Sequence, residues 1–205
     1  MNVATLLLAL VMWMGAPDRV AGHYVLENAH EMGSELVLKP DGQFEYMLAY
    51  GAADYTAGGK WKVKGDTVIL DSKVPDGPPL KVLASNYEKT PDLRIWIKGK
   101  NGRGIPNLDI KLTTAQGEKE ARTDSDGMAL FAATSEPKSA VVEIRVYHYD
   151  SPALALNSAH NTFTLEIDGD AITTVPFKGE VLKIKGDTLE MLYWDKTTPM
   201  VYRRQ

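Results

Sequence analysis

The sequence contains no cysteine in its 205 residues. Disulfides, thiolate metal sites, a cysteine nucleophile and the lipidated cysteine of a bacterial lipoprotein are therefore excluded. A protein without disulfides depends on its hydrophobic core, and 44% of these residues are hydrophobic. This length and composition suffice for one ordinary domain or two small ones with a core of their own.

Charge of either sign is nowhere concentrated. The 23 Lys and Arg and 27 Asp and Glu residues are interspersed, and the net charge is −4. Nucleic-acid-binding proteins normally carry a basic patch, so we expect no nucleic-acid partner. Helical periodicity is also missing beyond the N-terminal segment. The 17 Gly and 11 Pro residues are spread along the chain, which is typical of many short strands and turns.

The chain has one long apolar run, Ala4–Met14, near its N-terminus. It has the length of a signal-peptide core and is too short to span a bilayer, which takes about 20 residues. Small residues suitable for cleavage follow at 20–22, although the first residues include no Lys or Arg. The sequence predicts a signal peptide at 1–22 and a periplasmic or secreted protein that does not span the membrane. A buried N-terminal strand or helix is the alternative.

Two nearly identical heptapeptides lie far apart in the chain: Lys62–Val68 (KVKGDTV) and Lys183–Leu189 (KIKGDTL). Each has Gly-Asp between alternating apolar and polar residues, which predicts a β-hairpin. The block between them has a different texture, with five short strands separated by turn signals, which indicates a small β-sandwich.

The outer blocks together have the size of an up-and-down barrel, and closure would remove their exposed strand edges. We therefore predict an all-β protein with an antiparallel barrel interrupted by an inserted sandwich. The barrel would comprise residues 23–87 and 151–205, and the sandwich residues 88–150. Domains in tandem are the alternative arrangement.

The outer blocks resemble the lipocalin-like small bacterial β-barrels. The resemblance rests on Glu35–Phe44 (ELVLKPDGQF), Gly59–Leu70 (GKWKVKGDTVIL), Lys185–Tyr193 and Met200–Arg204. It implies a barrel fold and carries no catalytic signature.

The middle block is similar to carboxypeptidase-regulatory or transthyretin-like modules, in Gly102–Leu112 and Thr123–Phe131 (TDSDGMALF). That resemblance implies a non-catalytic sandwich used for rigidity or contacts. The C-terminal Tyr-Arg-Gly-Ser motif of the hydrolytic transthyretin-like enzymes is absent.

Aromatic residues fall on the inward parity of the predicted barrel strands. Eight-stranded barrels are either filled by side chains or hold one small ligand. In a hollow barrel, an apolar pocket would be lined by Tyr46, Tyr50, Trp61 and Tyr193, with tyrosine hydroxyls to orient the ligand. In the sandwich, Trp96 has Arg94 and Lys98 on its own face. It is a candidate partner contact if exposed, or a packing residue if covered.

Catalytic and metal-binding signatures are scarce. The sequence has no Gly-x-Ser-x-Gly elbow, no Walker loop, and no carboxylate that can be assigned to orient a histidine. Thr123–Gly127 resembles a calcium loop but lacks the closing Glu, which favours a hairpin turn. We expect no enzyme, no cofactor and no catalytic residue. The metal alternative is copper: cleavage after Gly22 would make His23 the mature N-terminus. Its amine and imidazole could bind Cu(II) together with a second histidine, which would be His30, His148 or His160.

These observations favour an exported, non-enzymatic binding or accessory protein. It would bind a small apolar molecule in the barrel or an envelope protein through the sandwich. The alternatives are a copper-binding protein using His23 and a purely structural envelope module.

Overall fold

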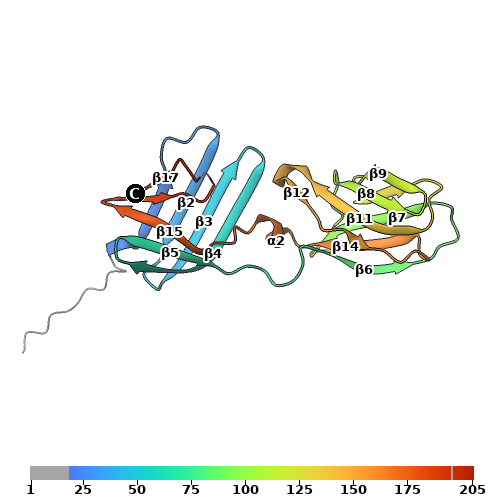
Figure 1. The fold of residues 1–205 in the computed structure, drawn as a ribbon, viewed down its shortest axis with the longest axis horizontal. Helices are drawn as coiled ribbons and strands as arrows, with labels where there is room; N and C mark the ends of the chain where they lie inside the picture. The colour runs from blue at the N-terminus through green and yellow to red at the C-terminus, as the bar shows by residue number, and fades with distance from the viewer. Residues whose placement is uncertain (1–18, 195) are drawn as a thin grey trace, which may run out of the picture. The chain divides into compact units, whose positions relative to one another are not determined.

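The computed structural model describes residues 19–194 and 196–205; most of the predicted signal peptide lies outside them. The protein is all-β, with a closed eight-stranded antiparallel barrel and two further sheets (Figure 1). In barrel order the strands are β1 (Gly22–Leu26), β17 (Met200–Arg204), β16 (Thr188–Met191), β15 (Lys178–Lys185), β5 (Thr67–Ser72), β4 (Ala53–Lys64), β3 (Gln43–Tyr50) and β2 (Met32–Leu38).

The two heptapeptides form the hairpins β4–β5 and β15–β16, as predicted. Their turns need a left-handed residue, which Gly65 (φ 62°) and Gly186 (φ 60°) supply without strain. The hairpins lie side by side, because β5 pairs with β15 and Val68 stands opposite Leu182. The prediction of one barrel built from both ends of the chain is therefore confirmed. In Figure 1 the blue-to-teal and the red strands form this unit together.

The barrel is filled by side chains. Alternation along each strand turns every second residue inward, and large apolar groups occupy these positions. The buried side chains of this unit include Tyr24, Leu36, Leu38, Phe44, Tyr46, Leu48, Trp61, Val68, Leu70, Phe177, Leu182, Leu189, Met191 and Tyr202. Truncating a buried aromatic residue of this kind to alanine costs about 3–5 kcal/mol.

Residues 19–21, which precede β1, are hydrogen-bonded to Tyr24 of β1 and Arg204 of β17. The Tyr24 hydroxyl donates a hydrogen bond to the Val20 carbonyl over 2.7 Å. The Arg204 guanidinium donates to the carbonyls of Arg19 (2.6 Å) and Ala21 (2.9 Å). It also lies 5.4 Å from the centroid of the Tyr24 ring, within cation–π range.

The inserted unit consists of two sheets. The first has the order β10 (Met128–Phe131), β7 (Leu93–Gly99), β14 (Thr162–Ile167), β6 (Leu80–Asn86). The second has the order β12 (Tyr149–Asp150), β11 (Pro137–Ile144), β8 (Asp109–Thr114), β9 (Gly117–Arg122), with β13 (Leu154–Ala155) beside β11. Buried residues of both sheets share one core, among them Ile95, Ile97, Ile110, Leu112, Val142, Phe163 and Leu165.

The junctions of this unit differ from the expected ones. The unit comprises residues 74–175, together with 49–56, instead of 88–150. Strands β6 and β14, which we expected in the barrel, pair with each other in the first sheet of the insertion. The period-two alternation of Phe163, Leu165 and Ile167 would be the same in a barrel strand and in a sandwich strand. The pattern therefore identifies a strand but not the sheet to which it belongs. The unit also contains two short helical turns, η1 (Arg145–Tyr147) and α2 (Gly169–Thr173).

Candidate functional site

Two of the predicted pocket residues are part of the filled barrel interior. Tyr46 is 3% exposed and Trp61 is 5% exposed. The indole N–H of Trp61 donates to the Lys39 carbonyl over 2.9 Å, which satisfies its one polar group. Trp61 is therefore a packed core residue in this structure.

Two other predicted residues lie away from the interior. Tyr50 shares the inward parity of β3 but stands at its last residue and is 56% exposed. Trp96 lies in the middle of β7, half-buried, with Met128 on one neighbouring strand and Thr164 on the other. In the part of the chain that the structure describes, neither Tyr50 nor Trp96 makes a ring contact with another aromatic residue.

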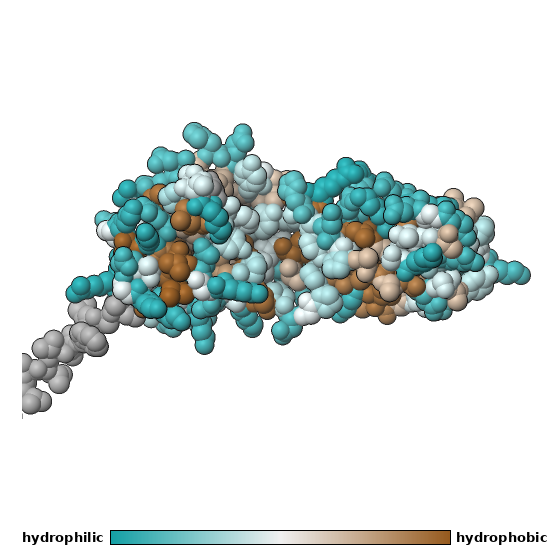
Figure 2. Space-filling model, in the orientation of Figure 1, coloured by the Kyte–Doolittle hydropathy of each residue, from teal (hydrophilic) through white to brown (hydrophobic). Residues whose placement is uncertain are grey.

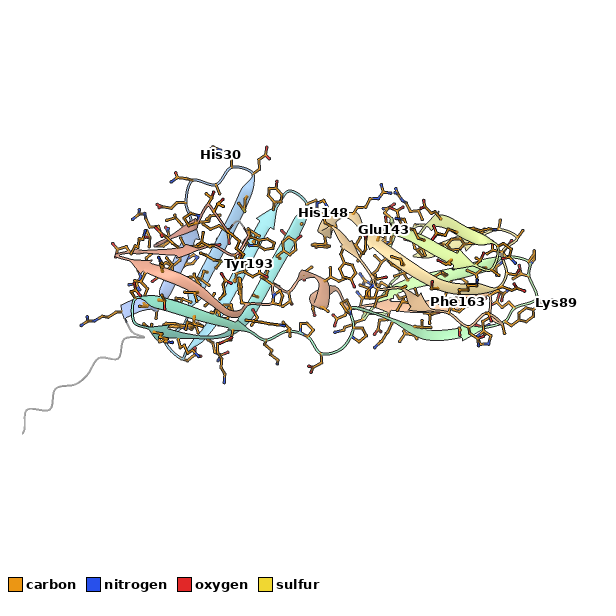
Figure 3. All side chains as sticks on the ribbon, in the orientation of Figure 1. His30, Lys89, Glu143, His148, Phe163 and Tyr193 are labelled. Atoms are coloured by element: carbon orange, nitrogen blue, oxygen red, sulfur yellow. The ribbon has the colours of Figure 1, made fainter. Side chains whose placement is uncertain are left out.

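Four aromatic rings form a continuous cluster at one end of the barrel, which we call the rim cluster: Tyr46, Phe177, Tyr193 and Trp194. Successive ring centroids are 5.1, 4.9 and 5.2 Å apart, and the planes meet at 76°, 81° and 80°. These are edge-to-face contacts, the favoured geometry for aromatic pairs. Figure 3 labels Tyr193 within the barrel unit.

Strand ends bring the rim cluster together. Phe177 immediately precedes β15, and Tyr193 and Trp194 follow β16, so the antiparallel pairing of these strands places all three at one barrel end. Two hydrogen bonds fix Phe177: its N–H donates to the Ser72 hydroxyl (3.1 Å), and its carbonyl accepts from the Ser72 N–H (2.8 Å). The Trp194 indole N–H donates to the Tyr46 hydroxyl over 3.2 Å.

Below the cluster, the hydroxyl of Tyr202 is enclosed in the barrel. It lies 2.9 Å from the Ser34 hydroxyl, which donates to the Met47 carbonyl over 2.6 Å. Burial raises the pKa of Tyr202 far above its ordinary value, with the neighbouring Tyr46 adding to the effect. The phenol therefore stays neutral and acts as a structural hydrogen-bonding group.

A groove of about 420 Å³ opens beside the rim cluster. We call it the rim groove. Its lining is Leu26, Glu27, Asn28, Ala29, Met32, Trp194, Thr198, Pro199, Met200 and Val201. Most of these side chains are apolar, and Trp194 is 46% exposed there. An exposed tryptophan in an apolar groove is a typical contact for an apolar molecule.

A second pocket, of about 470 Å³, contains a carboxylate. We call it the Glu180 pocket. Its lining is Gly179, Glu180, Val181, Lys183, Glu190, Leu192, Lys196, Thr197 and Pro199. Burial raises the pKa of Glu180, and the charge of Lys196 opposes that rise. The Lys196 ammonium lies 5.5 Å from the centroid of the Tyr193 ring. Figure 2 shows apolar surface over β15, the strand that carries Val181.

The histidines of the copper alternative are separated. The His23 ring lies on β1 with Nε2 2.9 Å from a Glu35 carboxylate oxygen. It stands opposite Val37 near the end of β2, whereas His30 precedes the start of β2 (Figure 3). Roughly 16 Å of strand separates those two positions. In the part of the chain that the structure describes, no three His, Asp or Glu side chains gather as a metal site requires.

Two polar clusters of the inserted unit make hydrogen bonds and ion pairs within the chain. Asp109 accepts hydrogen bonds from Arg122 (2.7 and 3.0 Å) and pairs with Arg145 (2.6 Å), and these cations lower its pKa. The Asp124 carboxylate accepts from the backbone N–H groups of Asp126 and Met128, both at 2.9 Å. A carboxylate used in this way stabilises a turn, in agreement with the hairpin interpretation of this segment.

Comparison with known proteins gives no relative: no protein-family model, curated protein or solved structure matches this chain. Among residues 19–194 and 196–205, no helix has the length and apolar character needed to cross a membrane.

Sequence reasoning identified two members of the rim cluster, Tyr46 and Tyr193, and missed Phe177, Trp194 and the neighbouring Glu180. One signal was present for Glu180. It shares the parity of Leu182 and Ile184 on β15, so alternation alone places a carboxylate on the inward face. Trp194 carries no such signal, because it follows the last regular strand position before a loop.

Proposed function

We propose that this chain is an exported, non-enzymatic binding protein that holds a small apolar molecule in the rim groove of a lipocalin-like barrel. The single observation that carries the proposal is the position of Trp194. Its indole is half-exposed in the groove while its N–H is held by Tyr46. The rigid ring therefore offers apolar area to a ligand with little loss of conformational entropy on binding.

The rim suits a ligand better than the barrel interior does. Large side chains such as Phe44, Trp61 and Tyr202 already fill the interior, and inserting a ligand would require displacing them. The rim groove has a volume of about 420 Å³, within the range of roughly 300–1,000 Å³ that is usual for small-molecule sites. Its few polar groups, among them Asn28 and Thr198, would orient the ligand.

The transthyretin-like sandwich serves in this proposal as a rigid module for contacts. Trp96, its candidate contact residue, is flanked by neighbouring strands and only half-exposed. The rim groove therefore offers the better-defined binding surface.

The test is a fluorescence titration of the full chain with N-phenyl-1-naphthylamine, an uncharged apolar probe. We expect saturable binding that weakens at least tenfold in Trp194→Ala. The matched control is Tyr87→Ala, which removes an aromatic residue that is 67% exposed in the inserted unit. Equal loss in both variants, or undiminished binding in Trp194→Ala, would overturn the proposal.

A further inference from the structure

We propose that Glu180 and the ring face of Tyr193 form a binding site for a primary alkylammonium ion, and that the side chain of Lys196 occupies this site in the free protein. Glu180 and Lys196 line the Glu180 pocket, whose lining shares only Pro199 with that of the rim groove. Tyr193 lies outside this lining and borders the site through its ring, which the Lys196 ammonium approaches. The inference therefore stands independently of the proposed apolar ligand.

Glu180 supplies a carboxylate to the proposed site. Glu180 stands opposite Leu70, a fully buried inward residue, so its side chain starts on the inward face of the barrel. Within the described residues it makes no hydrogen bond and no ion pair. A partly buried carboxylate without a partner destabilises a fold, because its desolvation is not compensated. A cation supplied by a ligand would provide that compensation.

Tyr193 supplies the aromatic ring of the proposed site. Edge-to-face contacts with Phe177 and Trp194 hold Tyr193 in place. The Lys196 ammonium lies 5.5 Å from the centre of this ring, inside the distance of about 6 Å at which cations are attracted to an aromatic face. The structure thus already places an alkylammonium group on Tyr193, although one that belongs to the chain itself.

Lys196 fits the proposed site only in part. Its charge acts on Glu180, yet the two side chains form no ion pair, since the ammonium is tethered to the backbone beside the ring. A free primary amine is not tethered in this way. It can direct an N–H donor to Glu180 while its charge remains over Tyr193. A quaternary ammonium ion has no N–H donor and should bind more weakly.

The experiment uses the full chain and n-butylammonium chloride, followed by two-dimensional 1H–15N NMR at the amides of the β15 and β16 ends. We expect Lys196→Ala to bind n-butylammonium at least fivefold more tightly than the unmodified chain. Lys62→Ala is the matched control, because it removes the same charge from an exposed position of the barrel that lies outside the lining of the pocket. It should leave the affinity unchanged within twofold.

Two further variants test the groups assigned to the site. In the Lys196→Ala background, Glu180→Gln should weaken binding at least tenfold, and Tyr193→Leu should also weaken it whereas Tyr193→Phe should not. 1-Butanol, with the same chain and no charge, should not shift the amides. Equal shifts with 1-butanol, no gain in Lys196→Ala, or full binding in Glu180→Gln would each overturn the inference. Binding of N-phenyl-1-naphthylamine to Glu180→Gln, measured in parallel, shows whether the rim groove is intact, so the two proposals can fail separately.

Discussion

The indole N–H of Trp194 donates a hydrogen bond to the hydroxyl of Tyr46, with 3.2 Å between nitrogen and oxygen. The contact joins a half-exposed residue after β16 to a buried residue of β3. It thereby converts a loop side chain into a fixed part of the barrel rim. A binding surface whose side chains are held in place loses less entropy when a ligand arrives.

Tyr46→Phe should therefore weaken the binding of N-phenyl-1-naphthylamine without removing any ring from the rim cluster. A net hydrogen-bond contribution of about 1 kcal/mol corresponds to roughly a fivefold loss of affinity. Fluorescence titration measures this loss of affinity. Tyr50→Phe is the control, because Tyr50 follows Tyr46 on β3 with the same parity but is exposed. An equal effect of the two substitutions would show that the Trp194–Tyr46 bond does not organise the groove.

Glu180→Gln should raise the stability of the protein near pH 7. The pKa of Glu180 is raised in the fold, chiefly by burial. The folded state therefore holds its proton to higher pH than the unfolded state does, and stability falls as pH rises through the interval between the two pKa values. Glutamine has no charge to bury, so the gain should be present at pH 7 and vanish near pH 3. Urea unfolding at pH 7 and at pH 3 measures this gain in stability. A loss of stability in Glu180→Gln at pH 7 would contradict this account.

Tyr202→Phe should destabilise the barrel by about 1–2 kcal/mol, the usual effect of removing one partner of a buried hydrogen bond. The Ser34 hydroxyl keeps its bond to the Met47 carbonyl, so no donor is left entirely without an acceptor. The urea concentration at the unfolding midpoint should fall, while the slope of the unfolding free energy against urea concentration should stay the same. Tyr87→Phe serves as the exposed control. An unchanged midpoint in Tyr202→Phe would mean that the Ser34–Tyr202 contact does not contribute.

The part of the architecture that local turn chemistry determines, which is the pair of hairpins, could be predicted from the sequence. Gly65 and Gly186 are required at left-handed turn positions, and the hairpins that they form lie together in the barrel. The alternation that placed Tyr46 and Trp61 inward was equally informative. It could not reveal whether the barrel is filled, because filling depends on the fit of side chains from strands far apart in sequence.

The domain junctions and the residues of the barrel rim could not be predicted from alternation or turn signals. Period-two alternation in β14 is the same for a barrel strand and a sandwich strand, so the pairing of β14 with β6 and β7 became evident only in the structure. Tyr50 has the inward parity of β3 but ends beyond the buried part of the barrel. Trp194 lies outside a strand, where no periodicity applies.

Asp109→Asn should make the inserted unit less stable at neutral pH, with the difference disappearing in acid. Arg122 first, and Arg145 after it, lower the pKa of Asp109. A depressed pKa contributes stability above the unfolded value, and this contribution is lost as pH falls through the folded value. Thermal unfolding between pH 2 and pH 7 measures the effect. In an Arg122→Gln, Arg145→Gln background the substitution should have little further effect; a full effect there would assign the stabilisation to other partners.

The most direct test of a ligand at the rim is 19F NMR of the full chain labelled with 5-fluorotryptophan. Trp61 reports on the barrel interior, Trp96 on the sandwich and Trp194 on the rim groove. The full chain has a fourth tryptophan, Trp13, which lies outside the described residues, and individual Trp→Phe variants assign all four signals. Titration with N-phenyl-1-naphthylamine should shift the Trp194 signal and leave those of Trp61 and Trp96 in place. A shift of Trp61 or Trp96 with Trp194 unmoved, or no shift of any signal, would contradict binding at the rim.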